Sequence, residues 1–205
     1  DLVRSRGLGD VYKRQSLCWQ LPALMMDKLT VVISPLIVLM HDQVRHLRER
    51  GIPSVHLDSL MTPAERADAL SQLTRGQAKI AFLAPERLNH PEIYALCRQH
   101  PPAMVVVDEA HCVVQWGDAF RPSYQQIGQF VASLPRRPVL CAMTATADKQ
   151  LQRGIAQSLG LRHPKRIVMP VERPNLHYSV LPTVHVTDAI LRALQKIPGK
   201  AVVFC

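Results

Sequence analysis

Two adjacent carboxylates, Asp108 and Glu109, directly follow the apolar run 103–107. This run is rich in Val and too short for a typical helix, so it predicts a strand buried on both faces. Such strands form parallel sheets, whose ligands bind beyond the carboxyl ends of the strands. There one carboxylate can hold a divalent cation while its neighbour orients a water for attack on a phosphate. The pair therefore indicates nucleotide hydrolysis; the alternative is an acidic cap on the next helix.

Three aromatic residues follow at a spacing of four: Trp116, Phe120 and Tyr124. That spacing is compatible with the apolar stripe of one amphipathic helix. A Gly and a Pro fall between the aromatics and disfavour an unbroken helix, so we favour a loop that also displays Arg121. Aromatic faces on a loop suit stacking on single-stranded bases, which contributes about 1–3 kcal/mol per base.

The string DEAH at 108–111 resembles motif II, the Walker B element, of a superfamily 2 helicase. The following HCVVQWGDAFRPSY resembles the aromatic-rich loop of the RecQ family of DNA helicases. The resemblance implies that Asp108 holds Mg²⁺ through water and that Glu109 polarises the attacking water. An RNA helicase that shares the DEAH string is a minor alternative, which the aromatic loop disfavours.

The same resemblance assigns a coupling role to residues beyond the acidic pair. It implies that His111 and Gln115 lie at the nucleotide site and connect it to bound DNA. The residues that it assigns to single-stranded DNA are Trp116, Phe120 and Arg121.

Three further segments resemble helicase motifs in the expected order. SPLIVLMHDQV resembles motif Ia, in which Ser34 contacts the DNA backbone or simply caps a helix. AFLAPERL resembles motif Ib, in which Arg87 meets a phosphate or pairs with an acid. TATA resembles motif III, in which Thr144 and Thr146 couple nucleotide to DNA; Thr146 capping the next helix is the alternative.

The first fifteen residues depart from the family pattern. A helix is predicted to begin at Ser16, which the resemblance places at the metal, but Arg14 and Gln15 stand where a P-loop ends in Gly-Lys. A P-loop needs glycines that turn backbone N–H groups around the phosphates and a Lys that reaches them. Lys13 is two positions too early to point the same way. We therefore predict that 1–15 is a non-native or disordered leader in place of the P-loop.

Residues 10–15, DVYKRQ, suggest a cause for that departure. They can be encoded by GAT GTG TAT AAG AGA CAG, which matches the mosaic-end sequence of transposase-based sequencing adapters. Our hypothesis is that adapter-derived sequence has overwritten a native P-loop. Genomic reads that span the junction, or different codons, would exclude it.

Strand-like and helix-like segments alternate along the rest of the chain. The predicted strands are 30–33, 79–84, 103–107 and 138–143, with a last strand at 201–205. Alternation of this kind predicts an α/β fold with a parallel sheet and helices on both faces. The resemblance makes it a RecA-like sheet of the P-loop NTPase type. It implies a first helicase lobe at 16–182 and the start of a second lobe at 183–205, with a helix at 186–197.

Composition narrows the class of protein. The 205 residues are 47% hydrophobic and carry a net charge of +9, which is compatible with a phosphate-binding surface. The five cysteines show neither a CxxC pair nor a metal-ligand spacing with the histidines. No apolar run is long enough to span a membrane, so we expect a cytoplasmic protein, bacterial and associated with the nucleoid.

Two functional classes remain open. The resemblance implies a parent enzyme that uses ATP and Mg²⁺ to unwind DNA in the 3′ to 5′ direction in repair and recombination, with single-stranded and duplex DNA as partners. The alternative for this chain is a nucleic-acid-binding module without turnover, because the P-loop lysine is missing.

Overall fold

The computed structural model describes residues 9–114, 122–145, 147–168, 177, 179–180, 182–196, 199 and 201–203, with the backbone alone for 9–15 and 122. The chain divides into two compact units, Asp1–Pro164 and Lys165–Cys205. The second unit contributes one described helix, α8 (Val186–Lys196), at the position predicted from the sequence. The lobe boundary at residue 182 stays a prediction. Among the described residues, no helix is long and apolar enough to cross a bilayer.

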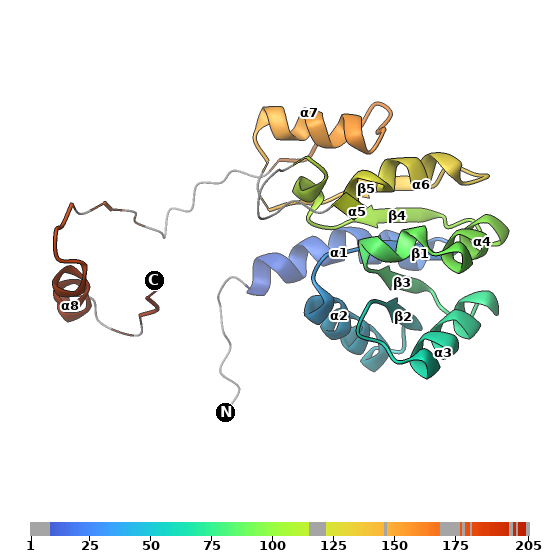
Figure 1. The fold of residues 1–205 in the computed structure, drawn as a ribbon, viewed down its shortest axis with the longest axis horizontal. Coiled ribbons are helices and arrows are strands. Elements are labelled where there is room, and N and C mark those ends of the chain that lie inside the picture. Colours follow the sequence, from blue (N-terminus) through green and yellow to red (C-terminus); the bar gives the residue numbers. More distant parts are fainter. Residues whose placement is uncertain are drawn as a thin grey trace. The chain divides into compact units, whose positions relative to one another are not determined.

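The first unit is built on a five-stranded parallel sheet with the strand order β2-β3-β1-β4-β5 (Figure 1). Its strands are β1 (Thr30–Ile33), β2 (Ser54–Leu57), β3 (Ile80–Leu83), β4 (Met104–Val107) and β5 (Val139–Ala142). The four predicted strands of this unit are confirmed, and all residues of β1, β3 and β4 are buried. The sequence analysis missed β2, in which polar Ser54 and His56 alternate with apolar residues.

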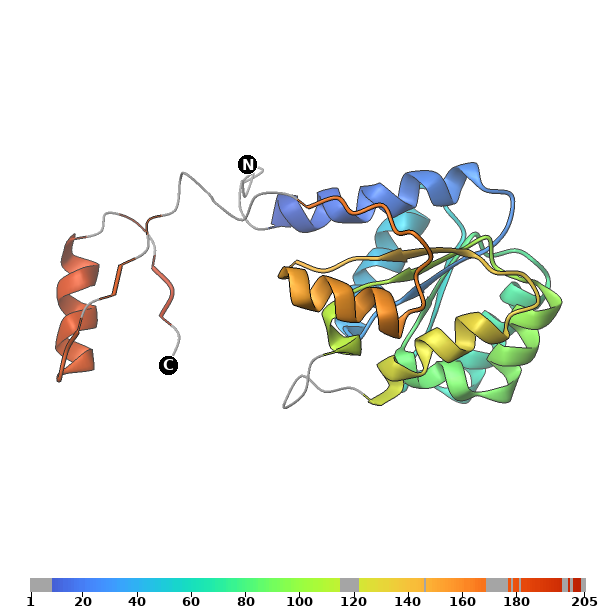
Figure 2. The ribbon, with the colours of Figure 1, turned by 90° about the horizontal axis from the view of Figure 1, so that it is seen from above.

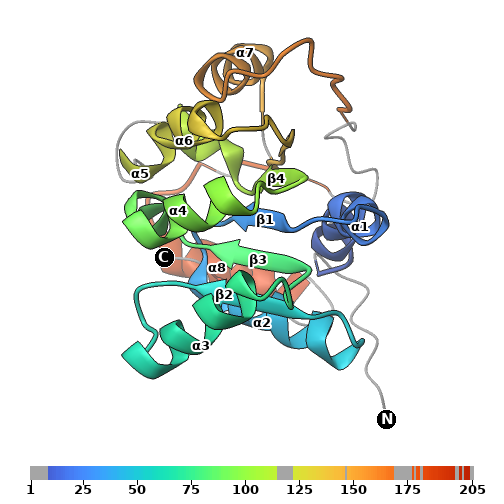
Figure 3. The same cartoon turned by 90° about the vertical axis from the view of Figure 1, so that its right-hand side faces the viewer.

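Helices cover both faces of the sheet, as predicted. They are α1 (Gly9–Met25), α2 (Ile37–Glu49), α3 (Pro63–Thr74), α4 (Pro91–Gln99), α5 (Pro122–Gln125), α6 (Ile127–Ser133) and α7 (Lys149–Ser158), with short 3₁₀ turns η1 (Pro85–Asn89) and η2 (Ala110–Val113). One face packs Val32, Phe82 and Val106 against α1 and α2. The opposite face packs against α3, α4, α6 and α7, and Figure 3 shows helices on either side of the sheet.

The alternation of side chains along each strand explains these two cores. Val31 and Val105 belong to the core under α3 and α4, whereas their neighbours Val32 and Val106 belong to the core under α1 and α2. Strand side chains point to opposite faces with a period of two. Residues that occupy the same row across these in-register parallel strands therefore share a face.

The helix predicted to begin at Ser16 begins earlier. α1 starts at Gly9 and continues without interruption to Met25 (Figure 2). The segment after Gly9 contains no further Gly or Pro before Pro22, and its Lys, Arg and Gln are good helix formers. Residues 9–15 are therefore helical rather than disordered, the alternative that 1–15 is non-native in sequence stays a prediction, and residues 1–8 lie outside the described residues.

The strand predicted at 201–205 is not formed by residues 201–203, which carry no strand assignment, and residues 204–205 lie outside the described residues. A strand requires a neighbouring strand to complete its backbone hydrogen bonds. The described part of the second unit contains no other strand with which 201–203 could pair.

Candidate active site at the carboxyl edge of the sheet

One row of residues lies immediately beyond the carboxyl ends of the strands. Backbone hydrogen bonds continue the ladders by one step: Ser34 N–H donates to the Leu83 carbonyl (3.2 Å) and Asp108 N–H to the Ile33 carbonyl (2.9 Å). Because this row follows the buried residues Ile33 and Val107, its side chains point to the face that α1 and α2 cover. The sheet therefore aims the Asp108 carboxylate at α1.

Hydrogen bonds fix the carboxylate of Asp108. Its Oδ2 accepts from the Ser34 hydroxyl at 3.3 Å, and its Oδ1 accepts from the Glu109 N–H at 3.0 Å. From the other side, the buried Tyr124 donates its hydroxyl to the Asp108 carbonyl at 3.0 Å. Asp108 is thus held at both its side chain and its backbone, as a metal-binding carboxylate must be.

The electrostatic surroundings of Asp108 disfavour the ionised form of its carboxyl group. Burial, and then the neighbouring carboxylate of Glu109, raise the pKa of Asp108, while the hydrogen bonds from Glu109 N–H and Ser34 oppose that shift. A carboxylate that is hard to ionise in isolation gains most from a bound cation. The direction of this shift agrees with a cation site at Asp108.

A small cavity lies beside this carboxylate. Its volume is about 20 Å³, enough for one water or one ion, and its lining includes Ser16, Ser34 and Asp108. Gln43 donates to the Ser16 hydroxyl at 3.1 Å and so fixes that side chain toward α2. Hydroxyl and carboxylate oxygens are the ligands that Mg²⁺ prefers, so the residues present fit this ion. The sequence analysis assigned Ser16 and Asp108 to one metal, and the structure brings both to one cavity.

Glu109 and His111 form the second half of the site. Glu109 adopts the left-handed backbone conformation (φ 48°), which is uncommon for a residue other than Gly and turns the chain sharply out of β4. His111 Nδ1 lies 3.1 Å from Glu109 Oε2 and 3.0 Å from the Thr144 hydroxyl. The Ala110 N–H donates to the Met143 carbonyl at 2.8 Å, which ties this turn to the end of β5. His111 therefore bridges the acidic pair and the predicted coupling residue Thr144.

The phosphate-binding half of a nucleotide site does not fit the residues present. Ser16 lies well inside α1, because the helix begins at Gly9. In a helix interior each N–H is bonded to the carbonyl four residues earlier and cannot turn toward a ligand. The backbone of residues 13–15, directly before Ser16, therefore offers no cradle of N–H groups for phosphates.

Two predicted DNA contacts have other partners in the structure. Ser34 is buried, donates to Asp108, and does not cap α2, whose N-cap is Leu36. Arg87 donates to the main-chain carbonyl of Asp58 and lies 3.4 Å from His90 Nε2, so it pairs with a carbonyl rather than with an acid. Their predicted roles toward DNA stay predictions.

Several predicted residues lie outside the described residues: Gln115, Trp116, Phe120, Arg121 and Thr146. The third aromatic of the predicted loop, Tyr124, is described, and it is fully buried in the short helix α5. For Tyr124 the interpretation as part of an exposed loop is wrong, because this residue lies in a helix and its ring belongs to the core. Its place in the stripe of aromatics at a spacing of four could have indicated this.

The sequence analysis also missed Gln43, which positions Ser16. Gln43 lies three residues after the core residue Met40 in α2, and this helical spacing could have indicated that it faces the same way. A larger cavity, about 650 Å³, lies at the opposite edge of the sheet near Leu29, Pro53 and Lys79, before the strands begin, and its described lining includes none of the predicted site residues.

Comparison with known proteins shows the family of this chain. The family model of the DEAD/DEAH box helicases matches residues 15–153. A parallel sheet with paired carboxylates beyond its carboxyl edge is compatible with nucleotide binding, and the match shows that the chain belongs to the DEAD/DEAH box helicase family.

Its relatives within that family are RecQ helicases, which confirms the resemblance found in the sequence. The chain is 43% identical to the ATP-dependent DNA helicase RecQ of Synechocystis over 81% of its own length and 36% of the relative's. It is 36% identical to RecQ of Haemophilus influenzae, with 93% and 31% covered, and 36% identical to the probable helicase RecS of Bacillus subtilis, with 93% and 39% covered. The chain therefore spans about a third of the length of these relatives.

Solved structures confirm the fold. The helicase domain of Pyrococcus furiosus Hef superimposes with a TM-score of 0.54 at 19% identity, covering 77% of this chain and 32% of that one. A hypothetical ATP-dependent RNA helicase from Sulfolobus tokodaii gives a TM-score of 0.57 at 16% identity, with 73% and 43% covered. Both agree with the predicted RecA-like helicase architecture.

Proposed function

We propose that this chain is the first lobe of an ATP-dependent DNA helicase of the RecQ type, which unwinds DNA in the 3′ to 5′ direction during repair and recombination. Single-stranded and duplex DNA are its partners, and a cytoplasmic location at the bacterial nucleoid follows from that substrate. DNA is favoured over RNA because the relatives at 36–43% identity are named DNA helicases, whereas the likeness to an RNA helicase concerns the fold alone.

The observation that carries the proposal is the cavity shared by Ser16, Ser34 and Asp108. Asp108 and Ser16 would hold Mg²⁺ there, and a bound Mg²⁺ supplies charge neutralisation for the phosphates of ATP. Glu109, which follows Asp108 and is turned by its left-handed backbone, would accept a hydrogen bond from the attacking water. The site then hydrolyses a phosphoanhydride with no protein nucleophile.

His111 provides the route from hydrolysis to DNA. Its Nδ1 lies within hydrogen-bond reach of both Glu109 and Thr144. A change in charge at Glu109 during turnover would alter which partner His111 prefers. The end of β5 would respond first, because Ala110 and Met143 join the two segments. Gln115 and Thr146 would extend this coupling.

A nucleic-acid-binding module without turnover is the second candidate for the chain with its present N-terminal residues. The uninterrupted helix α1 favours it, because phosphates need turned backbone N–H groups and a lysine before Ser16. The enzyme with a restored P-loop is therefore expected to hydrolyse ATP, whereas the unaltered chain is not. Both are expected to have the same fold.

Strand displacement tests the substrate. A version with a glycine-rich loop ending in Gly-Lys before Ser16, joined to the second lobe of a RecQ relative, is expected to unwind a DNA duplex with a 3′ overhang and to leave the matched RNA duplex intact. Equal or preferential unwinding of RNA would contradict the DNA helicase proposal.

Trp116→Ala in the same restored protein tests the aromatic loop. We expect DNA-stimulated ATPase to fall about tenfold, as for the loss of one base-stacking contact, while basal ATPase stays within twofold. Equal losses of basal and stimulated activity would mean that the Trp116 ring has only a structural role.

A further inference from the structure

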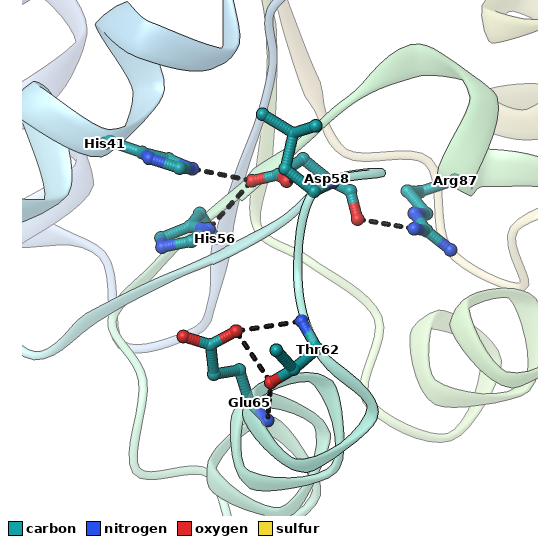
Figure 4. A network of polar contacts seen from close by, with 7 residues as sticks. His41, His56, Asp58, Thr62, Glu65 and Arg87 are labelled. Atoms are coloured by element: carbon teal, nitrogen blue, oxygen red, sulfur yellow. Dashed lines mark hydrogen bonds and ion pairs between the residues drawn. The ribbon is translucent and has the colours of Figure 1, made fainter.

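A second cluster of metal-binding side chains lies on the same sheet, away from the nucleotide site. It contains His41 from α2, His56 from the edge strand β2, and Asp58 directly after β2 (Figure 4). His41 Nε2 lies 2.8 Å and His56 Nδ1 2.9 Å from Asp58 Oδ2. The three ligand atoms all lie within 4.8 Å of one another.

One side of the cluster is buried in the protein, and the other side is open to solvent. Asp58 is fully buried, and its Oδ1 accepts from the Leu60 N–H at 2.8 Å, which leaves Oδ2 to face the two imidazoles. The His41 side chain keeps 43% of its surface exposed and that of His56 keeps 23%, so an ion can enter from solvent. The centroids of the two rings lie 4.2 Å apart, and one nitrogen atom of each ring faces Asp58 Oδ2.

We propose that His41, His56 and Asp58 bind one Zn²⁺ ion, with water as the fourth ligand. Two imidazoles and one carboxylate with an open fourth position are a common zinc ligand set. In a tetrahedral site with ligand bonds of about 2.0–2.1 Å, neighbouring ligand atoms are about 3.3 Å apart. The nitrogen-to-oxygen distances of 2.8 and 2.9 Å therefore need to widen by only a few tenths of an ångström.

The proton balance of binding is simple. A neutral imidazole that donates from its facing nitrogen to Asp58 moves that proton to its other ring nitrogen, and the freed lone pair coordinates the ion. Nothing is oxidised or reduced, and a coordinated water completes the shell. Imidazole nitrogen selects Zn²⁺, Co²⁺ or Ni²⁺ over Mg²⁺, which prefers oxygen ligands.

The protonation states agree with this geometry. Burial, and then the nearby His41, lower the pKa of His56. Burial opposes ionisation of Asp58, but hydrogen bonds from His41, the Leu60 N–H and His56 outweigh it and lower the pKa of its carboxyl. Metal ligands must be unprotonated, and the lowered pKa of the His56 imidazole agrees with that requirement.

An ion at this position would join three elements of the first unit. It would link α2 to the edge strand β2 and to the turn at Asp58, whose carbonyl accepts a hydrogen bond from Arg87. His41 is distant in sequence from His56 and Asp58, and the three match no usual zinc spacing, so the fold is needed to bring His41 to the other two. The inferred role is to stiffen this edge of the sheet beside Arg87, independently of ATP hydrolysis.

Titration with Co²⁺, a spectroscopic substitute for Zn²⁺, tests the proposal on the full chain. Because Cys18 is exposed and can bind such ions, all proteins carry Cys18→Ser. The unaltered cluster is expected to bind one equivalent with visible absorption bands of a tetrahedral site. His41→Ala, which changes a partly exposed side chain, should weaken binding at least about 100-fold. His46→Ala, on the exposed surface of the same helix, is the matched control and should bind as the parent does.

Thermal unfolding gives an independent readout. Zn²⁺ at 100 times its dissociation constant is expected to raise Tm by about 5–10 °C in the parent and in His46→Ala, and by none in His41→Ala. Circular dichroism of each ion-free variant confirms that it is folded. Absence of one-to-one binding, or equal affinity in His41→Ala and the parent, would overturn the proposal. Failure of ATP hydrolysis in the restored enzyme would leave this result unchanged.

Discussion

Asp58 and Asp108 occupy the same row of one sheet, yet their surroundings are opposite. Each is the first residue after a parallel strand, β2 for Asp58 and β4 for Asp108, and the strand ends are in register across β3 and β1. Burial and Glu109 raise the pKa of Asp108. At Asp58 burial acts in the same direction, but hydrogen bonds from two imidazoles and one N–H lower the pKa.

If the two proposed sites are occupied as inferred, neighbours, rather than the carboxylate or its place in the sheet, decide which cation each site selects. Asp108 has hydroxyl groups beside it and a like charge next to it, so it needs a hard cation such as Mg²⁺. Asp58 faces imidazole nitrogens, which suit Zn²⁺. The parallel strands thus place both carboxylates at equivalent positions. Side chains from the helix packed above each strand end then contribute to the difference in their surroundings.

The largest expected effect is a loss of ATP hydrolysis when the acidic pair is changed, accompanied by a gain in stability at Asp108. In the P-loop-restored two-lobe protein, Asp108→Asn and Glu109→Gln should each lower ATP hydrolysis at least about 100-fold, because a cation ligand or the base for the attacking water is lost. Steady-state ATPase assays measure this. Asp108→Asn should also raise Tm in the absence of Mg²⁺, because it removes a buried charge beside Glu109.

The matching change at the other end of the row is Asp58→Asn, which should lower Tm, because it removes an acceptor that two imidazoles share. ATPase in that variant should stay within about threefold of the parent. If both Asn variants shift Tm in the same direction, the proposed electrostatic contrast is wrong.

A smaller effect concerns the bridge between Glu109 and β5. Thr144→Val removes the hydroxyl that contacts His111 at 3.0 Å while keeping the side-chain volume. We expect the stimulation of ATPase by DNA to fall about tenfold, which corresponds to about 1.4 kcal/mol of coupling. Basal turnover should change less than twofold.

Thr74→Val is the control for that substitution. Thr74 is an exposed helix residue whose hydroxyl bonds only to the Leu70 carbonyl among the contacts described. It should leave both activities unchanged. Equal loss of basal and stimulated turnover in Thr144→Val would argue that the hydroxyl serves the chemistry itself rather than the coupling.

The smallest effect is the dependence of stability on pH in a chelating buffer. A carboxyl with a raised pKa holds its proton more tightly when folded, so the parent loses stability relative to Asp108→Asn as pH rises from about 4 through the folded pKa. For Asp58 the sign reverses: its lowered pKa contributes stability above about pH 4, which is lost as pH falls through the folded pKa. Urea unfolding at several pH values gives both slopes, and parallel slopes would contradict the assignment.

Much of the fold follows from local patterns. The strand 103–107 was predicted from its apolar run. The capping box of Thr62 and Glu65 (Figure 4) is likewise a pattern of neighbours in sequence. Strand β2 was missed because an edge strand with alternating polar residues has a weak pattern. The early start of α1 was missed because a family comparison, rather than helix propensity, set the expected boundary.

The site was predictable where it depended on one segment and unpredictable where it depended on packing. Asp108 and Glu109 could be identified from the strand that precedes them. Ser34 is buried against Asp108 because β1 and β4 pair in register. Arg87 reaches the Asp58 carbonyl because the segments after β3 and β2 lie close together. The cluster of His41, His56 and Asp58 arises only when α2 packs beside β2.

Binding of Mg²⁺-ATP is the measurement that tests the account most directly. Calorimetric titration compares the chain with its present residues before Ser16 against the version that carries a glycine-rich loop ending in Gly-Lys, both joined to the same second lobe. We expect the restored version to bind at least about tenfold more tightly, and to lose that gain with Asp108→Asn. Equal binding by the unaltered chain would mean that the phosphates are held elsewhere and that the cavity of Ser16 and Asp108 is not the nucleotide site.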